Sequence, residues 1–146
     1  MKSKLILMCV VVVVLLSLVA CSPAPKQVSI EVSCDDFIKL EPPRAISKDG
    51  EVAVGDLFAV TLCSSPTTGF KWELPKITDQ TVLQQVDHKF EPPEITKPPK
   101  EGAAGKEVWL FKALKEGKTT ISMEYSRPWE GGEKAAWTFV LTVVVK

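Results

Sequence analysis

The chain has 146 residues and a mass of 16.0 kDa, which predicts a single domain. Its 18 basic side chains balance 18 acidic ones and it has one histidine, which argues against a nucleic-acid-binding protein and against a site built from several imidazoles. The 11 prolines and 8 glycines disfavour a long helical bundle.

Residues 1–20 have the pattern of a secretory signal peptide. Lys2 and Lys4 precede the apolar run LILMCVVVVVLL, and the tetrapeptide LVAC, which ends at Cys21, follows it. A membrane-spanning helix is the alternative. Prolines at positions 23 and 25 end the apolar stretch after about 15 residues, however, which is short of the roughly 20 that a bilayer requires.

The tetrapeptide that ends at Cys21 closely resembles the lipobox of bacterial lipoproteins, whose cysteine receives a diacylglyceryl group and becomes the mature N-terminus. The resemblance implies lipidation of Cys21, a short tether over residues 21–27, and an extracytoplasmic protein anchored to a membrane of the cell envelope. Residues 1–20 contain two lysines and no acidic residue, so the mature chain carries 16 basic and 18 acidic side chains. Binding of nucleic acid through bulk charge is therefore not expected.

Cys34 and Cys63 remain as an even pair once Cys9 leaves with the signal peptide and Cys21 is lipidated. Because exported proteins meet oxidising conditions, we expect a disulfide between them, and two buried free thiols on neighbouring strands are the alternative. A metal site is not indicated, because the two cysteines lack the CxxC spacing and have no histidine nearby. Neither a metal nor another cofactor is expected.

Apolar and polar residues alternate with a period of two through most of residues 28–146, which predicts one all-β domain. The expected strands are 28–33, 57–63, 70–74, 82–90, 107–114, 118–126 and 135–145. The connection 35–56 has room for a short extra strand around 51–54, and no helix of useful length is visible. This spacing favours an immunoglobulin-like antiparallel β-sandwich of about seven to eight strands, with Trp72, Trp109 and Trp137 in its core.

Successive connections in a simple antiparallel sandwich alternate between its two ends. The loops 64–70, 91–106 and 127–134 should therefore share one end, and loops on a rigid scaffold are where binding usually occurs. The same alternation places the start of the first strand, residue 28, at this end, which would hold the loops near the membrane.

The loop 64–70 contains residues that restrict the backbone. Pro66 fixes its own φ, Gly69 can adopt a positive φ, and the β-branched Thr67 and Thr68 have few rotamers. Such a loop loses little entropy when it is bound. An ordinary turn punctuated by proline and glycine is the alternative.

The other two loops are also unusual. Arg127, Pro128 and Trp129 lie beyond the end of an alternating strand, where a core role for the tryptophan is hard to arrange, and Trp and Arg are enriched in interface hot spots. The alternative is that Trp129 folds back as a lid on the sandwich. The loop 91–106, which includes 102–105 (GAAG), is long for a compact domain and is hence either functional or mobile.

Together these loops resemble those of the chagasin family, protein inhibitors of papain-like cysteine peptidases. The family pattern is Asn-Pro-Thr-Thr-Gly-aromatic, a glycine-rich run and Arg-Pro-aromatic; here Ser65 replaces the asparagine, and 102–105 is poorer in glycine. The resemblance covers essentially residues 28–146 and implies a monomer that occludes the peptidase cleft without a covalent step. The residues it assigns to peptidase binding are Ser65, Pro66, Thr67, Thr68, Gly69, Phe70, Gly102, Ala103, Ala104, Gly105, Arg127, Pro128 and Trp129.

Two other classes of function are weaker. An enzyme is disfavoured because the one histidine, His88, lies in an ordinary expected strand where it should be solvated, with no credible Ser/His/Asp or Cys/His set. A non-inhibitory immunoglobulin-like envelope or adhesion module is the remaining alternative.

Overall fold

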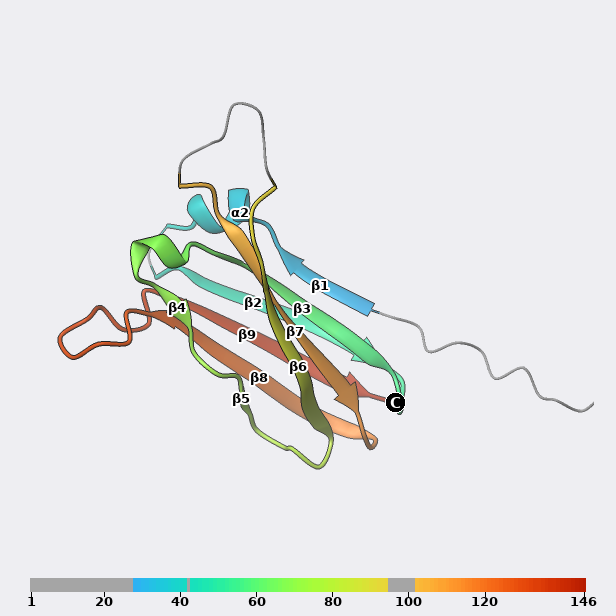
Figure 1. Ribbon diagram of the computed structural model, residues 1–146. Helices are drawn as coiled ribbons and strands as arrows, with labels where there is room; N and C mark the ends of the chain where they lie inside the picture. The colour runs from blue at the N-terminus through green and yellow to red at the C-terminus, as the bar shows by residue number, and fades with distance from the viewer. Residues whose placement is uncertain (1–27, 42, 95–101) are drawn as a thin grey trace, which may run out of the picture.

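The computed structural model describes residues 28–41, 43–94 and 102–146 (Figure 1), so the expected signal peptide, Cys21 and the tether lie outside the described residues. In that part of the chain it has nine strands, a short helix α2 and a 3-10 turn η1. The strands are β1 (Val28–Val32), β2 (Ala45–Val52), β3 (Leu57–Ser64), β4 (Lys71–Trp72), β5 (Lys76–Ile77), β6 (Leu83–Glu91), β7 (Gly105–Ala113), β8 (Gly117–Ser126) and β9 (Trp137–Val145). Helix α2 is Cys34–Ile38 and η1 is Pro66–Thr68.

The strands form two facing sheets (Figure 1). One has the order β1-β3-β7-β6; the other has the order β2-β9-β8-β4, with β5 also paired to β8. Alternate residues of β3, β7, β8 and β9 point between the sheets, where large apolar side chains exclude water. The fully buried ones include Phe58, Trp109, Phe111, Ile121, Phe139 and Leu141. The expected immunoglobulin-like β-sandwich is confirmed.

The sequence had predicted antiparallel sheets, but both sheets are mixed. Strand β1 runs parallel to β3, and β2 runs parallel to β9 over its whole length. The reason is β2 itself, which covers eight residues where only a short strand at 51–54 was expected. This additional crossing of the sandwich reverses the direction of β1 relative to the rest.

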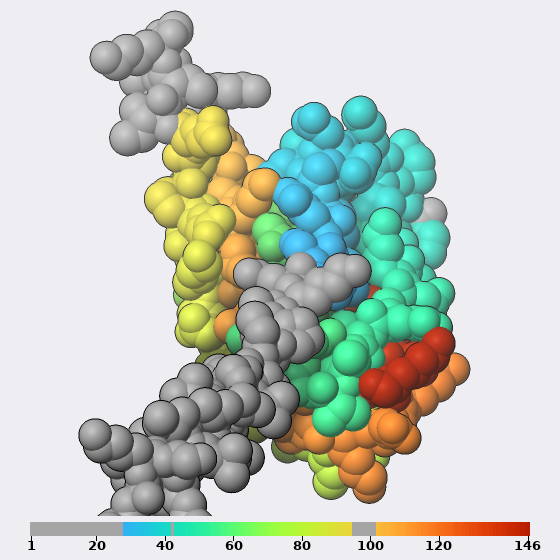
Figure 2. All heavy atoms as spheres, turned by 90° about the vertical axis from the view of Figure 1, so that its right-hand side faces the viewer, coloured from blue at the N-terminus to red at the C-terminus, as the bar shows by residue number. Residues whose placement is uncertain are grey.

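The direction of β1 corrects the expected position of residue 28. In the parallel register Val28 lies opposite Phe58 and Val32 lies opposite Leu62, so β1 starts at the end away from the loop that follows β3. The C-terminus lies at that same end (Figure 1), where the backbone N–H of Lys146 donates to the carbonyl of Val52. Figure 2 views the molecule from this side, with β1 and α2 in blue and the C-terminal atoms in red.

Smaller differences concern short elements that leave little periodic signal. The expected strand 70–74 is reduced to the two residues of β4, and β5 lies in a stretch that was expected to be a connection. Helix α2 follows β1 directly. Its N-cap Ser33 accepts a hydrogen bond from the N–H of Asp36 at 3.1 Å and donates one to the Asp36 carboxylate at 2.8 Å.

Candidate functional site

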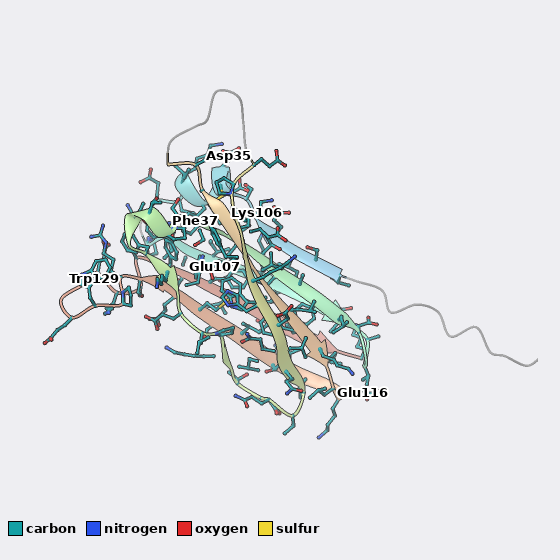
Figure 3. All side chains as sticks on the ribbon, viewed as in Figure 1. Asp35, Phe37, Lys106, Glu107, Glu116 and Trp129 are labelled. Atoms are coloured by element: carbon teal, nitrogen blue, oxygen red, sulfur yellow. A yellow bond between two sulfur atoms is a disulfide. The ribbon has the colours of Figure 1, made fainter. Side chains whose placement is uncertain are left out.

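The three loops singled out in the sequence meet at one end of the sandwich, as predicted. They are the β3–β4 loop (65–70), the described parts of the β6–β7 loop (92–94 and 102–104) and the β8–β9 loop (127–136), and we call this end the loop end. Thr68, Ala104 and Arg127, one from each loop, line the same hollow. Figure 3 shows Trp129 at this end and Glu116 at the opposite one.

The β3–β4 loop is a tight turn fixed by its own hydrogen bonds. The 3-10 turn closes with bonds from the N–H of Thr68 to the carbonyl of Ser65 and from the N–H of Gly69 to the carbonyl of Pro66, both 3.0 Å. The Thr68 hydroxyl also donates to the Ser65 carbonyl at 2.6 Å. Gly69 ends the turn with φ = 81°, a conformation that favours glycine. Pro66, Thr67 and Thr68 are exposed at its tip.

The β3–β4 loop is also attached to the opposite sheet through Tyr125 of β8. The Tyr125 hydroxyl accepts a hydrogen bond from the backbone N–H of Ser65 at 2.8 Å, and the tyrosine is 2% exposed. A buried, hydrogen-bonded phenol fixes the distance between the loop and the sheet. The loop therefore has little freedom left to lose when it binds a partner.

The β8–β9 loop is closed by bonds across its base. The N–H of Arg127 donates to the carbonyl of Glu133 at 2.8 Å, and the N–H of Ala136 donates to the carbonyl of Tyr125 at 3.0 Å. The Lys134 ammonium donates to the carbonyls of Arg127 and Trp129 at 2.7 and 3.3 Å. These contacts hold Trp129 on a closed loop rather than on a free end.

Trp129 packs directly on the β3–β4 loop and remains half-exposed. A Cβ placed on Gly69 would lie 2.5 Å from the indole Cη2, so only glycine lets the ring lie where it does. Trp129 is 51% exposed, so it does not act as a lid on the sandwich core. The Arg127 guanidinium stacks 4.4 Å from the centre of the Phe70 ring and lies 5.9 Å from that of Trp129. Two of the three loops thus brace each other.

Two residues assigned to peptidase binding have inward positions. Phe70 is 8% exposed and stacks on Tyr125 with ring centres 5.4 Å apart, so its side chain supports the loop from below. Gly105 is the first residue of β7 rather than a loop residue. A Cβ there would lie 2.5 Å from the carbonyl oxygen of Glu91, so the close approach of β6 to β7 requires this glycine.

The described part of the β6–β7 loop borders the hollow. Gly102 has φ = 68° with open space around its Cα, and Ala103 and Ala104 are half-buried beside it. Residues 95–101 of this loop lie outside the described residues. At the start of β7, Lys106 forms an ion pair with Glu31 of β1, and this hydrogen bond raises the pKa of the lysine. Both side chains are about half-exposed, so the pair stabilises the fold little.

The disulfide expected between Cys34 and Cys63 is present in the structure. It joins the first residue of α2 to β3, two residues before the β3–β4 loop begins. Phe37 of α2 is buried and stacks on Trp137 with ring centres 4.8 Å apart. Helix α2 is therefore part of the loop end, a position that the sequence analysis did not anticipate.

Two buried polar residues, Ser64 and Glu107, lie next to the loop end and contact the exposed His88. The Ser64 hydroxyl donates to one oxygen of the Glu107 carboxylate at 2.9 Å, and His88 Nε2 lies 2.7 Å from the other. The imidazole stacks on Trp109 at 4.7 Å between ring centres. His88 is an exposed residue of β6, as expected, and in addition its ring contacts Glu107 and Trp109. The serine and histidine bind the carboxylate rather than each other, so the group is not arranged as a nucleophile and base.

Several residues of the loop end were missed from sequence. Tyr125 was expected only as a strand residue, and the hydrogen bond that gives it a role spans 60 residues of sequence. Helix α2 did leave a signal, because Ser33 followed by Asp36 is a capping pattern. Within residues 28–41, 43–94 and 102–146, no cluster of histidine, cysteine or carboxylate side chains could hold a metal ion. The same residues contain no helix with the length and apolar content to cross a bilayer.

Known proteins share both sequence and fold with this chain. The family model described as chagasin family peptidase inhibitor I42 matches residues 51–143. Amoebiasin-2 of Entamoeba histolytica is 34% identical over 99 residues, or 65% of this chain and 75% of that protein. Chagasin of Trypanosoma cruzi is 34% identical over 83 residues, or 55% of this chain and 73% of that protein.

A solved structure of a cysteine protease inhibitor has a similar fold. The crystal structure of a cysteine protease inhibitor from Entamoeba histolytica matches with a TM-score of 0.63 at 21% identity, over 84% of this chain and 100% of that one. The family match covers more than half of the chain, including the β3–β4 and β8–β9 loops. The chain therefore belongs to the chagasin family and is a peptidase inhibitor, not an enzyme.

Proposed function

We propose that this protein is a reversible, tight-binding inhibitor of papain-like cysteine peptidases and that its loop end plugs the active-site cleft. The observation that supports this most directly is the contact of Trp129 with Gly69. It joins two loops that carry the family's motifs into one rigid projection, with Pro66, Thr67 and Trp129 exposed.

The mechanism is occlusion. A cysteine peptidase cleaves an extended segment held in register at its thiolate, whereas Pro66–Thr68 presents the closed backbone of a 3-10 turn. The turn can thus approach the thiolate without offering a peptide bond in a reactive geometry. Because hydrogen bonds already fix the loop, less freedom is lost on docking and more of the contact energy appears as affinity.

The loops have separate roles in this proposal. Thr67, Thr68 and Gly69 approach the catalytic thiolate, and Trp129 packs on the apolar surface beside the cleft. Arg127 braces the β8–β9 loop, since its guanidinium stacks on Phe70. The 102–104 segment borders the cleft from the other side. No cofactor or metal takes part.

Titration of papain with the domain 22–146 tests this proposal. We expect the activity to fall linearly to zero near one equivalent of inhibitor and to recover on dilution, without cleavage or covalent attachment of the domain. A cathepsin L-like peptidase serves as the second target. Full activity of both enzymes at stoichiometric amounts would favour a non-inhibitory envelope or adhesion module instead.

We further propose that the inhibitor is exported and held at a membrane of the cell envelope by lipid on Cys21. The support is the sequence pattern of residues 1–21. Radiolabelled palmitate should be incorporated into the full-length protein and not into a Cys21→Ser variant. Incorporation into both variants, or into neither, would contradict lipidation at this cysteine.

A further inference from the structure

The loop end contains a hollow of about 340 Å³ that no single loop forms. Thr68, Ala104 and Arg127 contribute to its lining from the three loops, and Ile38 contributes from α2. Beneath them lie the aromatic rings of Phe70 and Tyr125. The surface between the loops is therefore concave and largely apolar, and α2 is one of its walls.

Ile38 is among the most exposed large apolar side chains of the described residues, at 74%. The side chain gains nothing from burial in the free protein, where a polar residue would serve as well. The adjacent Phe37, by contrast, is 6% exposed and contacts Trp72, Tyr125 and Trp137. Helix α2 thus uses one aromatic residue as its anchor and presents the next residue to solvent.

Three contacts hold helix α2, and with it Ile38, in place. A five-residue helix does not form alone, because helix nucleation is unfavourable. Here the Ser33 cap starts the helix, the disulfide ties its first residue to β3, and Phe37 docks on the aromatic cluster. A rigidly held, exposed isoleucine beside a binding surface has the properties of an interface anchor.

We propose that α2 is a fourth contact element of the inhibitor and that Ile38, with the adjoining hollow, receives an apolar side chain from the rim of the bound peptidase's cleft. The proposal rests on the proposed function. The peptidase is the occupant because the hollow is continuous with the three loops, so a partner that covers them also covers the hollow. A contact with the rim is not needed for occlusion itself, so Ile38 tunes the affinity for particular peptidases.

The variant Ile38→Asp tests this proposal, with Val54→Asp as the matched control. Val54 is also an exposed apolar residue, at 47%, but it lies in the turn between β2 and β3 at the opposite end. Inhibition constants are measured for papain and for a cathepsin L-like peptidase, and melting temperatures for each variant. We expect Ile38→Asp to weaken inhibition of at least one enzyme about tenfold or more, because it places a carboxylate in an apolar contact. Val54→Asp should change neither constant.

The proposal would be overturned if the inhibition constants of Ile38→Asp equalled those of the unmodified domain for both enzymes. The proposed function would survive that result, because the unmodified domain would still inhibit and Trp129→Ala would still weaken inhibition. If the unmodified domain dimerises in sedimentation and Ile38→Asp abolishes the dimer without altering inhibition, a second copy of the chain is the occupant and the proposal is also wrong.

Amide hydrogen exchange provides a readout that needs no substitution. In the complex with papain, the amides of α2 and of the β3–β4 loop should both exchange more slowly than in the free domain. Slower exchange in the β3–β4 loop, with unchanged exchange in α2, would show that the peptidase covers the loops and not the helix, which contradicts the proposal.

Discussion

At the scale of single residues, Trp129 both supports the β3–β4 loop and exposes part of its side chain to solvent. One part of its indole lies on Gly69, while 51% of the residue remains accessible. Truncation removes exposed contact area without opening the core, because the side chain is not among the buried core residues. Its energetic role should therefore show in binding and not in folding.

The variant Trp129→Ala should weaken inhibition of papain by about 1 to 3 kcal/mol, as expected for an anchor residue, and should leave the melting temperature nearly unchanged. Leu114→Ala is the control, since Leu114 is 40% exposed in the β7–β8 turn at the opposite end. A melting temperature that falls strongly for Trp129→Ala would instead mean that the tryptophan stabilises the sandwich.

A comparison of Gly69→Ala with Gly55→Ala distinguishes the effect of backbone strain from the effect of displacing the Trp129 indole. Gly69→Ala places a residue with a Cβ at φ = 81° and puts that Cβ 2.5 Å from Trp129. Gly55→Ala places one at φ = 90° with nothing within 4 Å. Both variants should lose about 1 kcal/mol of folding free energy through strain at positive φ. Only Gly69→Ala should also weaken inhibition, and equal inhibition by the two variants would contradict a role for the Trp129 position.

At the scale of elements, the disulfide connects α2 to the strand that leads into the β3–β4 loop. Closing a loop between residues 29 apart stabilises a protein by about 3 to 4 kcal/mol in the chain-entropy model. The double variant Cys34→Ser, Cys63→Ser should unfold at a correspondingly lower denaturant concentration. Mass spectrometry of the unreduced wild-type protein should recover Cys34 and Cys63 in one linked peptide pair, and free thiols at both positions would contradict the bond.

The strands that the sequence predicted well are central strands of the two sheets, whose side chains fill the core. In β8 and β9 every second residue is buried over most of the strand, so hydrophobicity alternates and the strand is visible. Strand β3 is buried on both faces, and its mostly apolar sequence LFAVTLCS is visible for that reason. Strand β2 lies at the edge of its sheet, and Ile46 and Val52 are its only buried residues. Its sequence AISKDGEV therefore has almost no period, and its full length could not be predicted.

The loops were predictable for a different reason. Pro66, Gly69 and Pro128 restrict or permit particular backbone angles, and such residues mark a loop in sequence whatever surrounds it. Contacts between distant segments leave no such mark. The hydrogen bond from Ser65 to Tyr125, the packing of Trp129 on Gly69 and the inward position of Phe70 all depend on how the sheets are superposed.

At the scale of the whole molecule, the parallel pairing of β1 with β3 determines that β1 begins at the end opposite the loop end. Val28 and the loop end are separated by the length of β3, roughly 20 to 25 Å at about 3.3 Å per residue. If Cys21 carries lipid, the chain enters the domain at the end nearer the membrane and the loop end points outward. A peptidase in solution can then approach the loops without contacting lipid.

The lipidated protein on phosphatidylcholine vesicles should accordingly inhibit papain with the same association rate constant per exposed molecule as the soluble domain 22–146. Stopped-flow measurements with a fluorogenic substrate would give both constants. A vesicle-bound protein that associates more than about tenfold more slowly would mean that the membrane shields the loop end.

The disulfide at the end of β1 also determines how the domain bears a pull on its N-terminus. Tension on Val28 acts along an edge strand and loads its five residues in shear against β3. If that strand peels away, peeling stops at Cys34, where a covalent bond passes the force into Cys63 of a central strand. If lipid on Cys21 transmits such a pull, the load enters β3 through the disulfide and bypasses α2, so Ile38 keeps its position beside the hollow.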